Sequence, residues 1–86
     1  MRIDSVERGM LAKSKAGHDK GHVYVICKVE EPYVYLADGT NRTLEKLKKK
    51  KRKHVQIICV RNELSGIDNL GIRRILKMFD KENGRK

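Results

Sequence analysis

The sequence predicts a mainly β fold, a small antiparallel β-barrel followed by one C-terminal α-helix. Short runs rich in β-branched residues follow one another with little sequence between them, which is typical of small antiparallel barrels. Near the C-terminus the spacing of the apolar residues changes from two to about 3.6, the period of a helix. A chain of 86 residues suits one domain, residues 1–86, whose small core leaves little room for a deep catalytic cleft.

The first two predicted strands flank a glycine-rich turn. We expect a short strand within residues 9–16 and a longer one at residues 22–29. One face of the longer strand carries, at period two, Val23, Val25, Cys27 and Val29, and the other carries Tyr24, Ile26 and Lys28. In the turn, Gly17 and Gly21 indicate a backbone that needs positive φ or the close approach of a partner.

The remaining strands are predicted at residues 33–37, 40–44 and 54–60. Glu30-Glu31-Pro32 ends the second strand, and the β-branched and aromatic residues that follow it favour a third. Asp38-Gly39 is a strong signal for a tight hairpin turn, so we expect the chain to return at once as the fourth strand.

A block of positive charge precedes the last predicted strand. Residues 46–53, KLKKKKRK, hold seven basic residues in eight positions and show neither a period of two nor one of about 3.6. A like-charge block of this kind is normally a solvated loop. We therefore expect a basic loop at 46–53 whose side chains can displace counterions from a phosphate backbone.

The C-terminal segment has the pattern of an amphipathic helix. Its apolar stripe follows the spacing i, i+3, i+4, i+7 in Ile72, Ile75, Leu76 and Phe79. Ser65 and Asp68 stand three apart, as in a capping box. We predict a helix over residues 66–81 and a basic tail at 82–86. The stripe has two interpretations, packing onto the barrel or docking a protein partner.

The formal net charge is +10, from 21 Lys and Arg residues against 11 Asp and Glu residues. So much charge on a short chain repels itself unless a polyanion neutralises it, so the candidate partners are RNA, DNA and an anionic membrane. Stable attachment to a membrane usually takes two signals, and no apolar anchor lies beside the basic block. We therefore expect a nucleic acid and no membrane.

The cysteines and histidines predict neither a disulfide nor a metal site. Cys27 and Cys59 form no CxxC pair and lie within strand patterns, where they are expected to be small, buried and free. His18 and His22 flank a turn, and structural zinc needs four convergent ligands. The N-terminus lacks the apolar core of a signal peptide. We expect a cytoplasmic protein without metal or cofactor.

Motifs of the common enzyme classes are absent from the sequence. There is no phosphate-binding glycine loop of the Walker type, no serine elbow and no paired metal-binding helix motif. The carboxylates Glu30, Glu31, Asp38 and Glu45 are scattered over turns and strand ends, where solvated side chains that limit self-repulsion are expected. We predict no catalytic residue and no enzymatic activity.

Residues 7–21, ERGMLAKSKAGHDKG, resemble the opening of a KOW motif, and residues 23–29 resemble its remainder. The similarity continues through Ala37-Asp38-Gly39 to Lys53-His54 and covers residues 6–60. The chain is similar to bacterial KOW-domain RNA-binding proteins and to the KOW-type large-subunit ribosomal proteins of archaea and eukaryotes. It departs from many KOW motifs at Tyr24, near a position where glycine is common.

This resemblance implies an SH3-like β-barrel of the KOW type over residues 6–60 that binds structured RNA, often ribosomal RNA. It places residues of the segment 13–21 on the loop expected to approach RNA. Together with the basic block, the predicted RNA-binding residues are Lys13, Lys15, Gly17, His18, Lys20, Gly21, Arg42, Lys46, Lys48, Lys49, Lys50, Lys51, Arg52, Lys53 and His54.

Two hypotheses of function follow. The first is an RNA-binding protein, associated with the ribosome and contacting ribosomal RNA of the large subunit through phosphates. The alternative is a protein-interaction module of the transcription or translation apparatus, with ribosomal or transcription proteins as partners. Tyr24, Tyr33 and Tyr35 either stack on unpaired bases or pack across the sheet.

Overall fold

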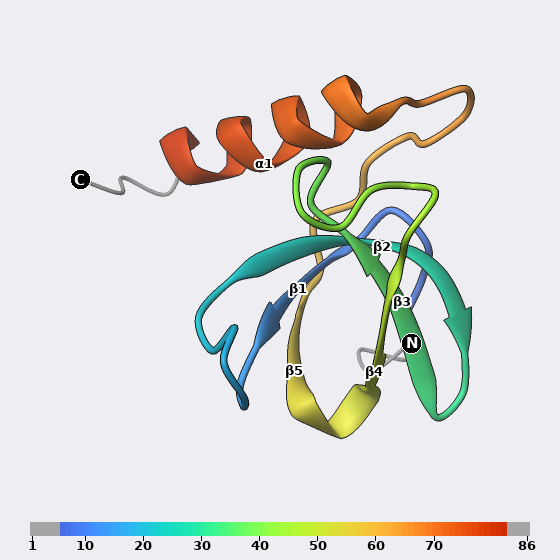
Figure 1. Ribbon diagram of the computed structural model, residues 1–86. Coiled ribbons are helices and arrows are strands. Elements are labelled where there is room, and N and C mark those ends of the chain that lie inside the picture. The colour runs from blue at the N-terminus through green and yellow to red at the C-terminus, as the bar shows by residue number, and fades with distance from the viewer. Residues whose placement is uncertain (1–5, 83–86) are drawn as a thin grey trace.

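The structure is a computed structural model that describes residues 6–82, in which five strands form one antiparallel sheet and a helix follows (Figure 1). The strands are β1 (Leu11–Ser14), β2 (Val23–Glu30), β3 (Tyr33–Ala37), β4 (Lys48–Lys51) and β5 (Val55–Ile58), with a 3-10 turn η1 (Arg52–His54) and the helix α1 (Asn69–Glu82). The sheet order is β4-β3-β2-β1-β5. The prediction of a mainly β fold with a C-terminal helix is confirmed.

Both faces of the curled sheet are apolar, and each supports its own core. The first core lies inside the curl and consists of Met10, Ala12, Tyr24, Ile26, Val34, Leu36 and Val55. The second lies between the outer face and α1 and is centred on Leu11, Val25, Ala37, Leu64 and Ile72. Successive strand residues point to opposite faces. Strands β1, β2 and β3 therefore contribute to both cores.

Strand β2 changes face at a bulge. Its pairing with β3 shifts between Ile26 and Lys28, so Cys27 is an extra residue in the ladder. Val23, Val25 and Cys27 belong to the second core as predicted, but Val29 packs against the first. The prediction of one continuous face from 23 to 29 is wrong at Val29, because the bulge reverses the alternation.

The predicted tight hairpin at Asp38-Gly39 and the predicted strand at 40–44 are wrong. Residues 38–47 form a loop, and the strand that returns beside β3 is β4. The Asp38 carboxylate accepts hydrogen bonds from the backbone N–H groups of Thr40 and Arg42, each at 2.9 Å. These N–H groups are bonded to a side chain, so they are not donors in a strand ladder.

The predicted basic loop at 46–53 is likewise corrected, because its centre is strand β4. Lys48–Lys51 pairs residue by residue with β3, from Tyr33↔Lys51 to Leu36↔Lys48. A strand at the edge of a sheet tolerates lysine well, since its charged side chains discourage pairing with another chain. Identical side chains carry no period, so the sequence pattern could not reveal this strand.

Strand β5 is shorter than the predicted 54–60 and ends at Ile58. Cys59 is exposed, not buried as predicted, whereas Cys27 is half-buried, and both thiols are free. Burial raises the pKa of the Cys27 thiol, although the Arg8 charge opposes this rise.

Helix α1 begins three residues later than predicted. Gly66 has φ +64°, which is incompatible with a right-handed helix at that point. Asp68 is the N-cap, because its carboxylate accepts the N–H of Gly71 at 2.8 Å and its carbonyl accepts that of Ile72 at 3.0 Å. The predicted capping box with Ser65 is wrong. The predicted tail at 82–86 lies, apart from Glu82, outside the described residues.

The apolar stripe of α1 packs onto the outer face of the sheet. Ile72 is fully buried in the second core, and Ile75, Leu76 and Phe79 pack against it. The first interpretation of the stripe, packing within the chain, is confirmed, because the stripe packs on the sheet. No helix in residues 6–82 has the length and apolar character needed to cross a membrane.

Replacing Ile72 with alanine tests how far the fold depends on this packing. The change opens a cavity in the second core, and we expect the free energy of unfolding to fall by about 2–5 kcal/mol. Met78→Ala on the same helix is the matched control, because the Met78 side chain is 56% exposed. Urea denaturation followed by circular dichroism measures both. Equal losses in the two variants would show that the helix is not anchored through Ile72.

Candidate nucleic-acid interface

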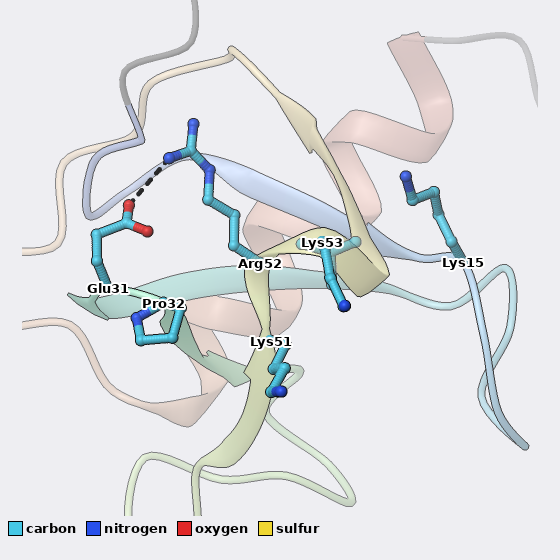
Figure 2. A pocket seen from close by; sticks show the side chains of 7 residues that line it. Lys15, Glu31, Pro32, Lys51, Arg52 and Lys53 are labelled. Carbon is cyan, nitrogen blue, oxygen red and sulfur yellow. Dashed lines mark hydrogen bonds and ion pairs between the residues drawn. The ribbon is translucent and has the colours of Figure 1, made fainter.

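Two open hollows meet beside the end of β1. The first, of about 580 Å³, is lined by Lys15, Glu31, Pro32, Lys51, Arg52, Lys53 and Val55 (Figure 2). The second, of about 600 Å³, is lined by Lys13, Ser14, Lys15, Lys20, Gly21 and Gln56. Lys15 lines both, so the hollows adjoin. We call the cations around them the basic surface: Lys13, Lys15, Lys20, Lys51, Arg52 and Lys53.

Backbone hydrogen bonds bring these distant segments together. The Lys15 N–H donates to the His54 carbonyl at 2.9 Å, which joins the end of β1 to the turn η1. The Gly21 N–H donates to the Ser14 carbonyl at 2.9 Å and closes the turn after β1. The Arg52 N–H donates to the Pro32 carbonyl at 2.8 Å. The basic surface is therefore built on a hydrogen-bonded frame.

The negative charge of this surface is small. Among the described residues that line the two hollows, Glu31 is the only carboxylate. Its Oε2 pairs with Nη1 of Arg52 at 3.0 Å, as Figure 2 shows. The pair is partly exposed and contributes little to stability. It leaves the lysines Lys15, Lys51 and Lys53 around the first hollow to attract an anion.

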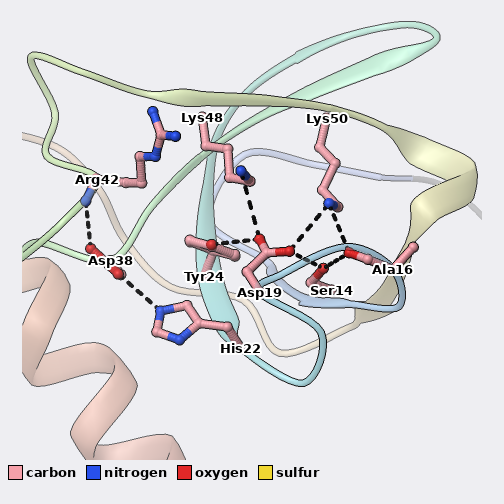
Figure 3. A network of polar contacts seen from close by, with 9 residues as sticks. All are labelled: Ser14, Ala16, Asp19, His22, Tyr24, Asp38, Arg42, Lys48 and Lys50. Atoms are coloured by element: carbon pink, nitrogen blue, oxygen red, sulfur yellow. Dashed lines mark hydrogen bonds and ion pairs between the residues drawn. The ribbon is translucent and has the colours of Figure 1, made fainter.

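Asp19 connects the turn after β1 to strand β4 (Figure 3). Its carboxylate accepts hydrogen bonds from the Ser14 hydroxyl at 2.8 Å and the Tyr24 hydroxyl at 2.7 Å. It also pairs with Nζ of Lys50 at 3.4 Å and Nζ of Lys48 at 3.8 Å. Lys50 donates in addition to the Ala16 carbonyl at 3.2 Å. One carboxylate therefore links the turn to three strands, β1, β2 and β4.

The titration of this cluster follows from its contacts. Burial alone would raise the pKa of Asp19, but the hydrogen bonds from Tyr24 and Ser14 and the charge of Lys50 hold it well below its usual range. The pKa of Tyr24 is raised far above its usual value by burial and by the hydrogen bond to Asp19. At neutral pH the carboxylate is ionised and the phenol is neutral.

The lysines of β4 divide by face. Lys48 and Lys50 are 25% and 13% exposed and are directed at Asp19. Lys49 and Lys51 are exposed on the opposite face, and Nζ of Lys49 lies 4.3 Å from the ring centroid of Tyr33. The block is therefore not one uniform set of phosphate ligands, because two of its lysines hold the fold together.

The structure gathers part of the predicted site. It brings Lys13, Lys15, Lys20, Gly21, Lys51, Arg52 and Lys53 to the two hollows. Gly17 and Gly21 have φ of +88° and +91°, so the prediction of positive φ is confirmed. The other predicted residues line neither hollow: Gly17, His18, Arg42, Lys46, Lys49 and His54 are exposed, whereas Lys48 and Lys50 pair with Asp19.

The tyrosine rings pack against other protein groups. Tyr24 is only 4% exposed and belongs to the first core, so stacking of this ring on a base is ruled out in this structure. Tyr33 and Tyr35 are half-buried, and each lies beneath a lysine, Lys49 and Lys28 respectively. For Tyr24 the packing interpretation is confirmed.

Asp38 was expected among the solvated turn carboxylates, and that expectation is wrong. It is 7% exposed, and Oδ2 lies 2.9 Å from Nε2 of His22. Burial would raise the pKa of Asp38, but the N–H groups of Arg42 and Thr40 and the contact with His22 lower it below its usual value. The sequence Asp38-Gly39-Thr40 indicates these contacts with backbone N–H groups, since Asp at a turn often accepts N–H groups of the following residues.

The structural role of Asp19 was likewise not predicted from the sequence. An acidic side chain between two glycines in a basic chain is unusual, but the sequence does not show that β4 lies opposite it. Within residues 6–82 no cluster of three or more His, Cys, Asp or Glu side chains could hold a metal ion. No family model matches the chain, and no curated protein matches it significantly.

Asp19→Asn tests the central carboxylate. Hydrogen bonds to a charged group contribute about 1.5–3 kcal/mol, so we expect the melting temperature at pH 7 to fall by roughly 10 °C. Because the folded-state pKa is lowered, the stabilisation is present above the unfolded pKa of about 3.9 and is lost as pH falls below it. The difference between wild type and variant should therefore shrink between pH 5 and pH 2, estimated from that reference value. Thermal melts across this range measure it, and a constant difference would contradict the assignment.

Proposed function

We propose that this chain binds structured RNA through the basic surface. The observation that carries the proposal is the placement of six cations around two adjoining hollows, with one carboxylate among the described lining residues. Lysine and arginine displace counterions from a phosphate backbone, which supplies affinity that is independent of sequence. The net charge of +10 provides long-range attraction toward such a polyanion.

The choice of RNA and of the KOW type rests on the resemblance together with the architecture. The segment that resembles a KOW motif, residues 7–29, contains β1, the glycine turn and β2, and these carry half of the basic surface. A five-stranded antiparallel sheet that curls around a core is what an SH3-like barrel requires. The proposed partner is ribosomal RNA of the large subunit, and the proposed location is the cytoplasm. We assign no catalytic residue.

The alternative, a protein-interaction module, has less support. It was motivated by the apolar stripe of α1, and that stripe is packed against the sheet. The residues Ile72, Ile75, Leu76 and Phe79 are therefore engaged within the chain, so we retain RNA as the proposed partner.

Neutralising the exposed lysines should change the salt dependence of RNA binding. We expect the triple variant Lys15→Gln, Lys51→Gln, Lys53→Gln to bind all structured RNAs more weakly. The slope of log K against log salt should fall by roughly two to three, since each phosphate contact contributes about 0.7–0.9. Fluorescence anisotropy with a labelled RNA hairpin, from 50 to 300 mM KCl, measures the slope.

The control removes the same charge elsewhere. Arg74, Lys77 and Lys81 are exposed cations of α1, and their joint replacement by glutamine lowers the net charge equally. We expect this variant to keep nearly the wild-type slope. If both triple variants lose the same slope, binding depends on total charge, and the basic surface is not the interface.

Association with the ribosome is tested by sucrose-gradient fractionation of native lysate with immunodetection. We expect the protein to migrate with the large subunit at low salt and to leave it at high salt, because phosphate contacts are screened. The Lys15, Lys51, Lys53 triple variant should stay at the top of the gradient at both salt concentrations. Wild-type protein that remains at the top at low salt would reject the ribosome as partner.

A further inference from the structure

Apolar side chains are exposed on helix α1, which forms one side of the molecule (Figure 1). The exposed large apolar side chains within residues 6–82 are Leu70 and Met78 on this helix and Val60 after β5, at 45%, 56% and 44% exposure. Met78 and Val60 line a third hollow, of about 290 Å³, whose other apolar walls are Leu11, Ile75 and Phe79. Exposed apolar residues that gather beside polar ones mark a surface that contacts a partner.

Two opposite charges flank Met78 on the helix. Arg74 lies four residues before it and Glu82 four residues after it, and both also line the third hollow. Residues four apart on a helix lie on the same face, one turn from each other. All three side chains are exposed. We call Arg74, Met78 and Glu82 the outer row of α1, which carries in order a positive, an apolar and a negative side chain.

The charges of the outer row are not compensated within the part of the chain that the structure describes. The positions three and four residues from Arg74 on the helix hold no carboxylate: they are Leu70, Gly71, Lys77 and Met78. Within residues 6–82, neither Arg74 nor Glu82 forms a hydrogen bond or an ion pair through its side chain. Both charges are therefore available to a partner that approaches the helix.

We propose that two copies of this chain pair through α1, antiparallel, about a twofold axis that passes beside Met78. In a twofold interface both copies use the same patch, so each contact occurs twice. An axis at Met78 sets the residue four positions before it opposite the residue four positions after it. Arg74 of each copy therefore faces Glu82 of the other, and the two Met78 side chains meet at the centre.

The outer row matches its own twofold image better than it matches a helix of one charge sign. A uniformly acidic helix would meet Glu82, and a uniformly basic helix would meet Arg74, so either would face a like charge. Methionine is flexible and fills irregular gaps. Met78 of one copy therefore suits the third hollow of the other, where it would cover the apolar walls that are otherwise open to water.

The positive charge of the chain opposes this pairing only weakly. The turn η1, which carries Arg52 and Lys53 of the basic surface, lies at the far end of the sheet from α1 (Figure 1). Exposed charges more than about 8–10 Å apart are largely screened at physiological salt. Pairing through α1 leaves both basic surfaces free, so this inference does not depend on what they bind. Because the patch is small, we expect a transient dimer.

Sedimentation velocity of the full chain measures the pairing. The protein is followed from about 5 to about 500 μM in about 150 mM KCl, because mass action populates a weak dimer only at the upper end. We expect the weight-average sedimentation coefficient to rise from the value of a monomer toward that of a dimer. A coefficient that stays at the monomer value, or that rises past the dimer to larger species, overturns the twofold pair.

Charge reversal identifies the contact. Arg74→Glu and Glu82→Arg each set like charges opposite one another, and we expect the association constant of each variant to fall by about tenfold or more. The double variant Arg74→Glu, Glu82→Arg exchanges the two charges and should associate within about threefold of wild type. An equal mixture of the two single variants also restores opposite charges at both contacts, so it should associate more strongly than either variant alone.

Lys77→Glu is the matched control. Lys77 is exposed and precedes Met78 by one residue, which places it about 100° around the helix. Its replacement changes the net charge as much as Arg74→Glu does and should leave the association constant within about twofold of wild type. Circular dichroism establishes that each variant keeps α1. Single variants that associate like wild type, a mixture no stronger than its components, or an equal loss in Lys77→Glu would overturn the proposed contact.

Discussion

The carboxylate of Asp19 is the contact on which the arrangement of the basic surface depends. Strand β4 is a run of four lysines, and like charges at this density repel one another. Asp19 pairs with the two that face inward and is itself oriented by the hydroxyls of Ser14 and Tyr24. The glycine turn is thereby fixed against β4, and the outward Lys51 lines the first hollow together with Lys15, beside the end of β1.

The two apolar faces of the sheet explain how a short chain with 5% aromatic residues supports this surface. A domain of this size buries only about 60% of the surface that its unfolded chain would expose. The first core, inside the curled sheet, and the second core, between the sheet and α1, together give β2 apolar neighbours on both faces. The helix is anchored to the sheet through Ile72, which is fully buried in the second core.

Position within the fold divides the positive charges into two groups. Lys48 and Lys50 are partly buried and share the Asp19 carboxylate, so part of their charge is already offset within the chain. Lys15, Lys51 and Lys53 stand around an open hollow with Glu31 paired to Arg52. The same residue type therefore serves stability in one place and is available to a polyanion in another. Within β4, the alternation of side chains separates Lys48 and Lys50 from Lys51.

The sequence by itself determined the strands at 22–29 and 33–37, the amphipathic helix and the positive φ of Gly17 and Gly21, because local periodicity and glycine report directly on backbone geometry. It also identified the cations, since charge is a property of composition. Tertiary structure alone decided which lysines face Asp19, that Asp38 is buried beside His22, and that the run of lysines is a strand. Those outcomes depend on pairing between segments distant in the chain, and a uniform run of lysines carries no local signal of its partner.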